Sequence, residues 1–541
     1  MKQRNQHIIQ GFVGLLVTAL PLQAANTKEA QKQIRHVVIL FQENVSFDHY
    51  FGTYPHALNP EGEPRFTPLP GTPKIEGYTP ELLTRNPNYL NPKNGAGRSN
   101  PFRLRRDQAA TADQDHSYGA EQQAFNGGKM DLFPASVGHP DGPRVAGEHT
   151  GILATSGLTM GYFDGNTVTA YWNYAQHYAM SDHQFDVIFG PSTPGAINLV
   201  SGQTNGVVND QNAEGGMLPD GNGGFTLISD PNPVGDLCSS TSDSLVHMTG
   251  RNIGDLLSEA NVTWGFFQGG FDLSVVNPNG STGCRRNSTS PWTKIRIRDY
   301  VPHHEAFQYY KSTANPKHLR PSSPEVVGTN HDGGANHQYD THDFFDAVSA
   351  GNFPTISYLK AAAYQNGHAG NSSPLDEQQW IVRVINFLEQ RPEWEHTAVI
   401  IAYDDSDGWY DHLMRKIVNG SATAKDALDG PSKCGNGAKA LPGVNPMTKH
   451  AQGRCGPGPR LPLLLISPWA KPNYVDHTVT DQTSIIRLIE DLYLNGKRIG
   501  GGSFDAQAGS LLGMFDFSKG KPQNTGRLIL DPDTGLVKAG E

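Results

Sequence analysis

Short apolar runs, each bounded by polar or turn-forming residues, recur along the chain. Runs that are apolar at consecutive positions are typical of strands buried on both faces of a sheet. They predict strands at residues 36–41, 262–267, 353–359, 397–403 and 461–467. Three other segments repeat apolar residues at three- and four-residue spacing, which predicts helices with one apolar face. These helices are expected at residues 167–180, 376–390 and 481–494, with Thr480 or Asp481 as the N-cap of the last one.

Apolar strands that alternate with helices predict an α/β fold with a mostly parallel sheet covered on both faces. The chain has 541 residues, of which 60 are Gly and 38 are Pro, so much of it is expected to be loop. Loop-rich insertions are predicted near residues 55–110, 205–295 and 415–460 within a single catalytic domain spanning 25–541. No heptad, collagen-like or longer repeat is present, which excludes coiled coils, collagen and solenoids.

The N-terminus has the pattern of a secretory signal peptide. Lys2 and Arg4 precede a mostly apolar stretch at residues 8–20, and Ala24 follows as a small residue at the expected cleavage site. Cleavage after residue 24 would leave no stable membrane anchor and predicts a periplasmic or extracellular protein. The net charge of −10, or −12 without the signal peptide, disfavours a nucleic-acid partner.

Four cysteines fit an oxidising compartment. Four cysteines allow three pairings, and the shortest loops are closed by Cys238–Cys284 and Cys434–Cys455. These two pairings are the expected disulfides, each in a Gly-, Asn- or Ser-rich loop. No pair has the C-x₂-C spacing of a zinc site.

Acidic residues follow two of the predicted strands. Glu43 and Asn44 come just after the first strand, and Asp404 and Asp405 come directly after the strand at 397–403. Ligands collect at the carboxyl ends of parallel strands. If the two segments meet, three carboxylates and one amide oxygen would form a shell for one hard or borderline divalent cation. Taken separately, either pair could equally be a turn or helix cap.

Residues 190–195 (GPSTPG) predict the start of a helix at Ser192. A serine before a proline is often only an N-cap. The same geometry also aims a hydroxyl at backbone N–H groups and the positive end of a helix dipole, which bind phosphoryl groups. A cation on the oxygen would make it a nucleophile. Ala196 stands where formylglycine sulfatases need Arg, so that enzyme class is excluded.

Several long segments resemble a bacterial phosphoesterase family that contains secreted phospholipases C and metal-dependent acid phosphatases. They occur in family order at residues 36–55 (HVVILFQENVSFDHYFGTYP), 113–133 (DQDHSYGAEQQAFNGGKMDLF), 189–204 (FGPSTPGAINLVSGQT), 301–310 (VPHHEAFQYY), 398–412 (AVIIAYDDSDGWYDH) and 467–490 (SPWAKPNYVDHTVTDQTSIIRLIE). YDDSDGWYDH and GPSTPG are closer to the acid-phosphatase branch. The resemblance implies an alkaline-phosphatase-like, three-layer α/β/α fold.

The resemblance also implies roles for individual residues. Glu43, Asn44, Asp404, Asp405 and Ser192 would bind one divalent metal ion, and Ser192 would be the nucleophile. Three histidines, His116, His304 and His368, would be catalytic and would contact the phosphoryl group or the leaving group, with Asn44 as a further substrate ligand. His303 is adjacent to His304 and is the alternative at that position. Zn²⁺, Ca²⁺, Mg²⁺ and Mn²⁺ all suit the oxygen ligands.

Three functions follow from these residues. The leading expectation is an acid phosphatase of broad phosphomonoester specificity that acts through a phosphoserine on small phosphorylated substrates. The alternative is a phospholipase C that cleaves phosphatidylcholine-type lipids at the glycerol-side phosphodiester. The third is a non-catalytic surface or sugar-binding protein. Such a protein would tolerate loss of the serine or the acids, and since this chain has kept them all, this function is disfavoured.

Overall fold

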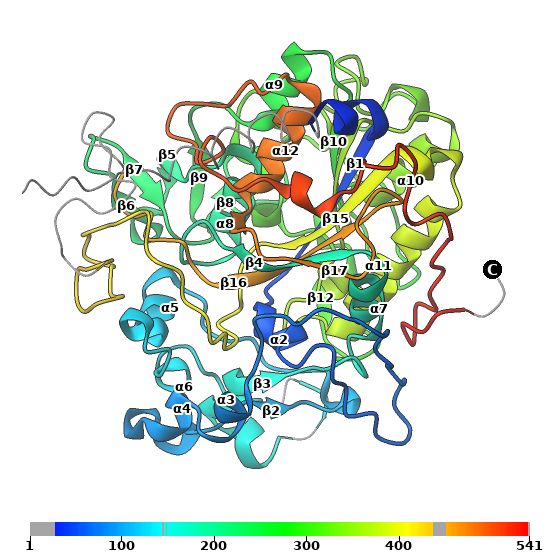
Figure 1. Cartoon of the computed structure of the whole chain (residues 1–541). Coiled ribbons are helices and arrows are strands. Elements are labelled where there is room, and N and C mark those ends of the chain that lie inside the picture. The colour runs from blue at the N-terminus through cyan, green and yellow to red at the C-terminus, as the bar shows by residue number, and fades with distance from the viewer. Residues whose placement is uncertain (1–26, 143–144, 148, 436–450, 539–541) are drawn as a thin grey trace, which may run out of the picture.

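A computed structural model describes residues 27–142, 145–147, 149–435 and 451–538. The predicted signal peptide at 1–24 and part of the predicted insertion at 415–460 lie outside the described residues. Figure 1 shows a central sheet with helices on both sides: α8 (Ser192–Ser201) and α12 (Thr483–Tyr493) lie on one side, and α7 (Thr169–His177) and α11 (Pro374–Glu389) on the other. This arrangement confirms an α/β class.

The central sheet is mixed. Its strands, in spatial order, are β13 (Gln338–Tyr339), β10 (Trp264–Gln268), β14 (Ile356–Lys360), β1 (His36–Gln42), β15 (Thr397–Tyr403), β16 (Arg460–Ile466), β4 (Ala179–Phe185) and β17 (Tyr474–Asp476), and β18 (Thr480–Asp481) also pairs with β4. The pairs from β13 to β15 are parallel. Strand β16 is antiparallel to both of its neighbours, whereas β17 and β18 run parallel to β4.

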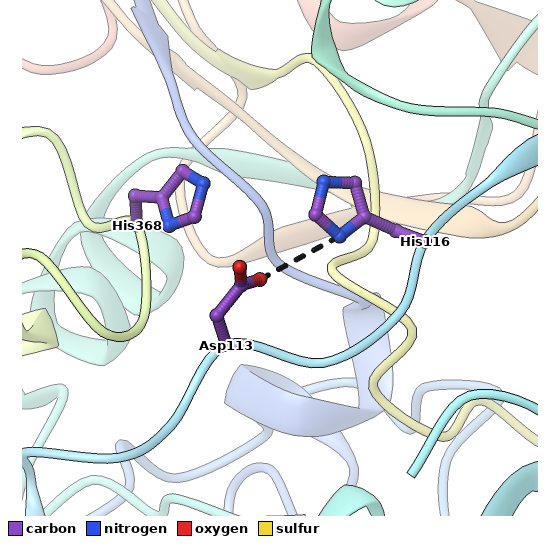
Figure 2. Close-up of side chains that lie close together, drawn as sticks. All are labelled: Asp113, His116 and His368. Atoms are coloured by element: carbon purple, nitrogen blue, oxygen red, sulfur yellow. Dashed lines mark ion pairs between the residues drawn. The ribbon is translucent and has the colours of Figure 1, made fainter. Parts of the chain in front are cut away.

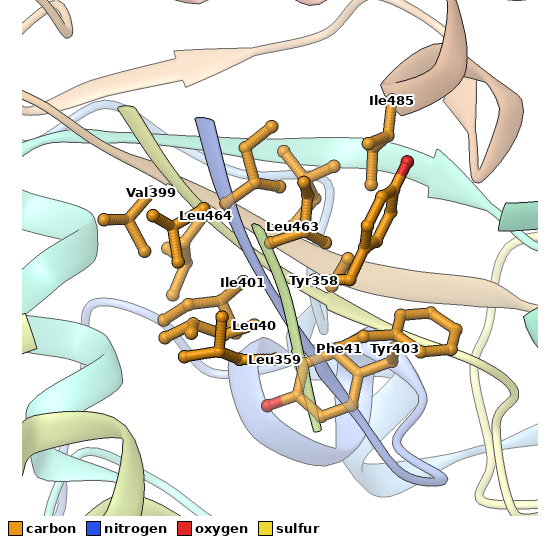
Figure 3. Packing of buried hydrophobic residues seen from close by; sticks show 14 of the residues in the cluster. Leu40, Phe41, Tyr358, Leu359, Val399, Ile401, Tyr403, Leu463, Leu464 and Ile485 are labelled. Atoms are coloured by element: carbon orange, nitrogen blue, oxygen red, sulfur yellow. The ribbon is translucent and has the colours of Figure 1, made fainter. Parts of the chain in front are cut away.

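The predicted strands are consecutively apolar because both faces of the sheet are covered. All seven residues of β15 and all seven of β16 are buried. Figure 3 shows side chains from four neighbouring strands, among them Leu40, Leu359, Ile401 and Leu464, packed into one core. Burial of each such side chain stabilises the fold by about 1.5–3 kcal/mol relative to an exposed position.

The prediction of a helix over 167–180 is wrong at its C-terminal end. Helix α7 stops at His177, and Ala179 and Met180 already belong to strand β4. Strand β4 reads AMSDHQF, and its polar centre hides it from a search for apolar runs. The cap of α12 also differs: Gln482 holds the N-cap position, although Asp481 Oδ1 accepts a hydrogen bond from Thr483 N at 2.8 Å.

The predicted insertion at 205–295 contains regular structure. Five short strands form a second sheet: β5 (Asn205–Gln211), β6 (Met217–Pro219), β7 (Phe225–Leu227), β8 (Asn232–Pro233) and β9 (Leu245–Met248). Helix α9 (Ile253–Glu259) follows, and α10 (Thr341–Ser349) packs near β10.

Smaller elements complete the described chain: α2 (Phe47–Phe51), α3 (Pro80–Thr84), α4 (Pro87–Leu90), β2 (Phe102–Arg103), α5 (Tyr118–Phe125), α6 (Phe133–Ser136), β3 (Gly161–Tyr162), β11 (Asn287–Thr289) and β12 (Arg296–Arg298). Both predicted disulfides, Cys238–Cys284 and Cys434–Cys455, are present. Within the described ranges, no helix has both the length and the apolar character needed to cross a membrane.

Candidate active site

The acidic residues of the two predicted strand ends lie side by side. Strands β1 and β15 are parallel neighbours with Gln42 opposite Tyr403, so the next residues of each chain segment face one another. Asn44 N donates to Asp404 Oδ1 at 3.0 Å, and Val45 N donates to Asp405 O at 2.9 Å. Hydrogen bonding between the two segments therefore continues past the strands, once through the Asp404 carboxylate and once between backbone groups.

The Ser192 hydroxyl points into this acidic cluster. Ser192 Oγ lies 2.8 Å from Asp405 Oδ2, 3.4 Å from Asn44 Oδ1 and 3.5 Å from Glu43 Oε2. Ser192 is the first residue of α8, and the N-cap position belongs to Pro191, with no side-chain cap hydrogen bond. The hydroxyl therefore does not cap the helix, and it is free to take part in chemistry at the acids.

The cluster concentrates negative charge away from water. Glu43, Asp404 and Asp405 are all fully buried. Burial, with Asp404 nearby, raises the pKa of Asp405 to about 7 although the His116 charge opposes the shift. Burial and the Asp404 charge also raise the pKa of Glu43 well above its ordinary value. Carboxyl groups in this state gain strongly from a nearby cation.

Lys360 supplies one such cation, and sequence reasoning missed it. It is the last residue of β14, on the other side of β1, and it is fully buried. Its Nζ forms ion pairs with Glu43 Oε1 and with Asp404 Oδ2, the latter at 3.1 Å, and lies 4.7 Å from the centre of the Phe41 ring. A lysine inside an apolar strand was the available signal, because buried lysines are rare unless they are paired.

Two of the predicted histidines reach the same cluster. His304, in the turn Pro302–His304, has Nδ1 at 3.1 Å from Glu43 Oε1. His116 has Nε2 at 3.3 Å from Asn44 Nδ2, and its Nδ1 lies 2.8 Å from Gln114 O. His303 contacts His304 edge to face at 4.5 Å between ring centres.

The electrostatic surroundings of these histidines differ. Burial lowers the pKa of His304 well below its ordinary value, and His303 and Lys360 add to the shift. Burial also lowers the pKa of His116, but the carboxylates of Asp405 and Asp113 outweigh it and raise this pKa to about 10. In the chain without a bound cation, His116 is therefore the charged histidine and His304 the neutral one.

His368 lies across the site from His116. The ring centres are 6.1 Å apart. Figure 2 shows the two rings on either side of the Asp113 carboxylate. Asp113 Oδ1 is 3.7 Å from His116 Nδ1, and the three side chains form one of the groups with metal-ligating atoms close together. His368 Nδ1 lies 2.6 Å from Ala369 O.

Two other polar residues that the sequence analysis missed form hydrogen bonds to the loops that carry the site residues. Glu121, in α5, accepts hydrogen bonds from Ser406 Oγ at 2.7 Å and Gly190 N at 2.9 Å, so it ties the acidic loop to the serine loop. Asp230 accepts a hydrogen bond from Thr193 N at 2.8 Å. Neither residue follows an apolar strand, so no pattern singled it out.

The donor set fits one divalent cation. Oxygens of Glu43, Asn44 and Asp405 surround the Ser192 hydroxyl within 3.5 Å, and Asp404 lies next to them. Three buried carboxyl groups meet here, and Lys360 and His116 are the positive charges that face them. Oxygen ligands with excess negative charge suit Mg²⁺, Ca²⁺ or Mn²⁺, and Zn²⁺ also binds carboxylates.

A serine hydroxyl lies beside buried acids at the carboxyl ends of parallel strands, which is where ligands collect in open α/β sheets. Comparison with known sequences identifies the family. A sequence model described as "Phosphoesterase family" matches residues 34–494, so the chain belongs to that family and is a phosphoric-ester hydrolase.

The named relatives are phospholipases C. The non-hemolytic phospholipase C of Pseudomonas aeruginosa is 24% identical over 490 residues, which are 88% of this chain and 56% of the relative. Phospholipase C A of Mycobacterium tuberculosis is 23% identical, over 84% of this chain and 72% of its own length. Non-specific phospholipase C3 of Arabidopsis thaliana is 22% identical, over 82% and 65%. The chain thus spans little more than half the length of the Pseudomonas enzyme.

Proposed function

We propose that the chain hydrolyses phosphodiesters of the phospholipase C type with Ser192 as nucleophile and one bound divalent cation. The contact of Ser192 Oγ with Asp405 Oδ2 at 2.8 Å, among acids from two distant chain segments, carries the proposal. The sequence favoured a phosphomonoesterase with an acid-phosphatase-like motif. The relatives named phospholipase C favour the diester, and a phosphocholine or related head group on a diacylglycerol is the proposed substrate.

The cation would be held by Glu43, Asn44, Asp404, Asp405 and Ser192, and it would lower the pKa of the serine hydroxyl and neutralise charge on the phosphoryl group. Ser192 Oγ gives its proton to Asp405 Oδ2 and attacks phosphorus. A bond forms from Oγ to phosphorus, and the bond from phosphorus to the glycerol oxygen breaks. The departing alkoxide takes a proton from a site histidine. Water then attacks phosphorus and gives a proton back to the histidine. The bond from phosphorus to Ser192 Oγ breaks, Oγ takes back the proton held by Asp405, and the phosphorylated head group leaves.

His116 is the best placed of the histidines to bind a phosphoryl oxygen. Its Nε2 lies 3.3 Å from Asn44 Nδ2, and in the chain without a bound cation its pKa is raised to about 10, because burial is outweighed by the carboxylates of Asp405 and Asp113. The N-terminus of α8 contributes less than the sequence suggested, because Thr193 N is already bonded to Asp230 and Pro194 has no N–H. Binding of the phosphoryl oxygens therefore depends mainly on the cation and the histidines.

The test compares turnover of nitrophenyl phosphate, nitrophenyl phosphorylcholine and phosphatidylcholine vesicles, with and without chelator. Ser192→Ala should abolish turnover while the fold and cation content remain. Its matched control is Ser201→Ala, at the other end of α8, where the hydroxyl donates to Ile197 O and Gln203 O. Ser192→Ala activity within a few fold of the control would refute the nucleophile. A preference for nitrophenyl phosphate over both diesters would contradict the proposed phosphodiesterase and favour the phosphomonoesterase.

A further inference from the structure

A second cluster of metal-ligating side chains lies on the edge of the central sheet. Asp182 Oδ1 is 2.8 Å from His183 Nδ1 and 2.8 Å from His477 Nδ1. The two imidazole rings meet edge to face with 5.9 Å between their centres. One atom from each of the three residues lies within 4.8 Å of the others. These residues share no member with the site around Ser192.

An irregularity in β4 brings two consecutive residues to the same point. Successive side chains of a regular strand point to opposite faces of the sheet. Between its pairings at Ser181 and Gln184, β4 has one more residue than the facing part of β16, so Asp182 and His183 lie in a bulge. A bulge re-aims a side chain, and bulges are concentrated near functional sites. The third member, His477, follows β17, which pairs with β4 up to Ser181.

The carboxylate is held in place before any ion arrives. Asp182 is fully buried, and its second oxygen accepts a hydrogen bond from Glu76 N at 2.8 Å. Arg460 donates to the Asp182 backbone oxygen at 3.1 Å, while its own charge is paired with Asp48 and Asp411. Partners of this kind orient a ligand and tune its affinity for a metal ion.

The two histidines leave the cluster open to solvent on one side. The His477 side chain is 59% exposed and the His183 side chain 17%, so both rings are in contact with solvent. All four cysteines are taken up by the two disulfides, so no thiol competes for a soft ion.

We propose that Asp182, His183 and His477 form a second cation site that takes a divalent transition metal ion of the zinc type. Two imidazole nitrogens and one carboxylate oxygen, with a free position for water, are ligands that Zn²⁺ accepts and that Mg²⁺ and Ca²⁺ do not favour. The ion would displace the Nδ1 protons that now face the carboxylate. It would join β4 to the segment after β17.

The experiment separates this site from the one around Ser192 by working in an Asp405→Asn background. Untagged Asp405→Asn protein is dialysed against Zn²⁺ or Co²⁺, and bound metal is measured by elemental analysis and visible absorption. We expect one Zn²⁺ that is bound through His477 and that excess Mg²⁺ does not displace. His477→Ala in the same background should weaken its binding by roughly a hundredfold, since loss of even a supporting partner costs about 10–100-fold.

The matched control is His247→Ala. His247 also pairs with an acid, with Nδ1 at 2.7 Å from Asp210 Oδ2, but in the part of the chain that the structure describes no third metal-ligating side chain joins this pair. Zn²⁺ binding that survives His477→Ala, that is lost equally in His247→Ala, or that is absent from Asp405→Asn protein would overturn the proposal. The measurement requires no turnover, so a failure of the phospholipase proposal would leave its result unaffected.

Discussion

Lys360 gives a direct test of how the acidic cluster is held together. Its Nζ contacts Glu43 and lies 3.1 Å from Asp404 Oδ2, and all three side chains are fully buried. Lys360→Met keeps the length and apolar stem of the side chain but removes the charge. Removing one partner of a buried ion pair costs about 3–5 kcal/mol, because the remaining charge stays in a poor solvent.

We therefore expect Lys360→Met to lower the free energy of unfolding by about 3–5 kcal/mol in the presence of chelator. Protonation of one carboxyl would bring the loss towards the lower end of that range. A bound divalent cation replaces the missing positive charge, so the deficit should shrink when the cation is restored. Urea unfolding followed by circular dichroism, with and without chelator, measures both quantities.

The control is Lys497→Met. Lys497 pairs with Glu259 at 3.0 Å, but both side chains are 55% exposed, and an exposed pair contributes about 0–1 kcal/mol. If Lys360→Met were no more destabilised than Lys497→Met in chelator, the buried lysine would not be the counter-charge of the acids. A deficit that stayed the same after the cation was restored would refute the link to cation binding.

Three further outcomes follow from the structure. Burial raises the pKa of Glu389 from an ordinary 4.5 to about 7, so the fold favours its protonated form. The stability that this group contributes is complete below pH 4.5 and falls by about 3 kcal/mol as the pH rises to 7. Glu389→Gln should flatten this part of the pH–stability curve, and a curve unchanged in this variant would contradict the role given to Glu389. His304→Ala should reduce kcat by about a hundredfold and lower the cation content, because His304 contacts Glu43. His303→Ala should have smaller effects on both quantities. Equal effects in the two variants would contradict the choice of His304 as the site histidine. Replacing Cys434 and Cys455 by Ser opens a loop of 21 residues and should lower the free energy of unfolding in urea by about 3 kcal/mol. An unchanged free energy of unfolding would contradict this prediction.

The parts of the fold that could be predicted are those where burial dictates the sequence. Strand β15 occupies the predicted residues 397–403. The buried strands beside it are also apolar runs of similar length in the sequence. The acids after β1 and β15 could be paired because parallel strands end at the same edge. Whether Ser192 lies beside these acids depends on the direction of α8. The turn at 190–195 predicted that a helix begins there, and the family resemblance implied that Ser192 joins the acids.

The missed parts are those where a polar residue is buried by its partners. Lys360 ends an apolar strand and is paired only through residues far away in the sequence. Strand β4 is polar at its centre because Asp182 and His183 bond to one another and to Glu76 and His477. Neither arrangement repeats at the period of a helix or a strand, so a search for periodicity does not find it, although a lysine at the end of an apolar run is itself unusual.

The register of the strands explains why a substitution at Asp405 should leave the backbone of the cluster in place. Val45 N donates to the backbone oxygen of Asp405 and so continues the backbone hydrogen bonding between β1 and β15 beyond the last paired residues, Gln42 and Tyr403. The backbone of the cluster is thus held by the sheet. Replacing Asp405 by Asn preserves the side-chain shape and removes one of the charges that disfavour one another in the absence of a cation. Such a variant should be at least as stable as the parent protein in chelator and should lose that advantage when the cation is present.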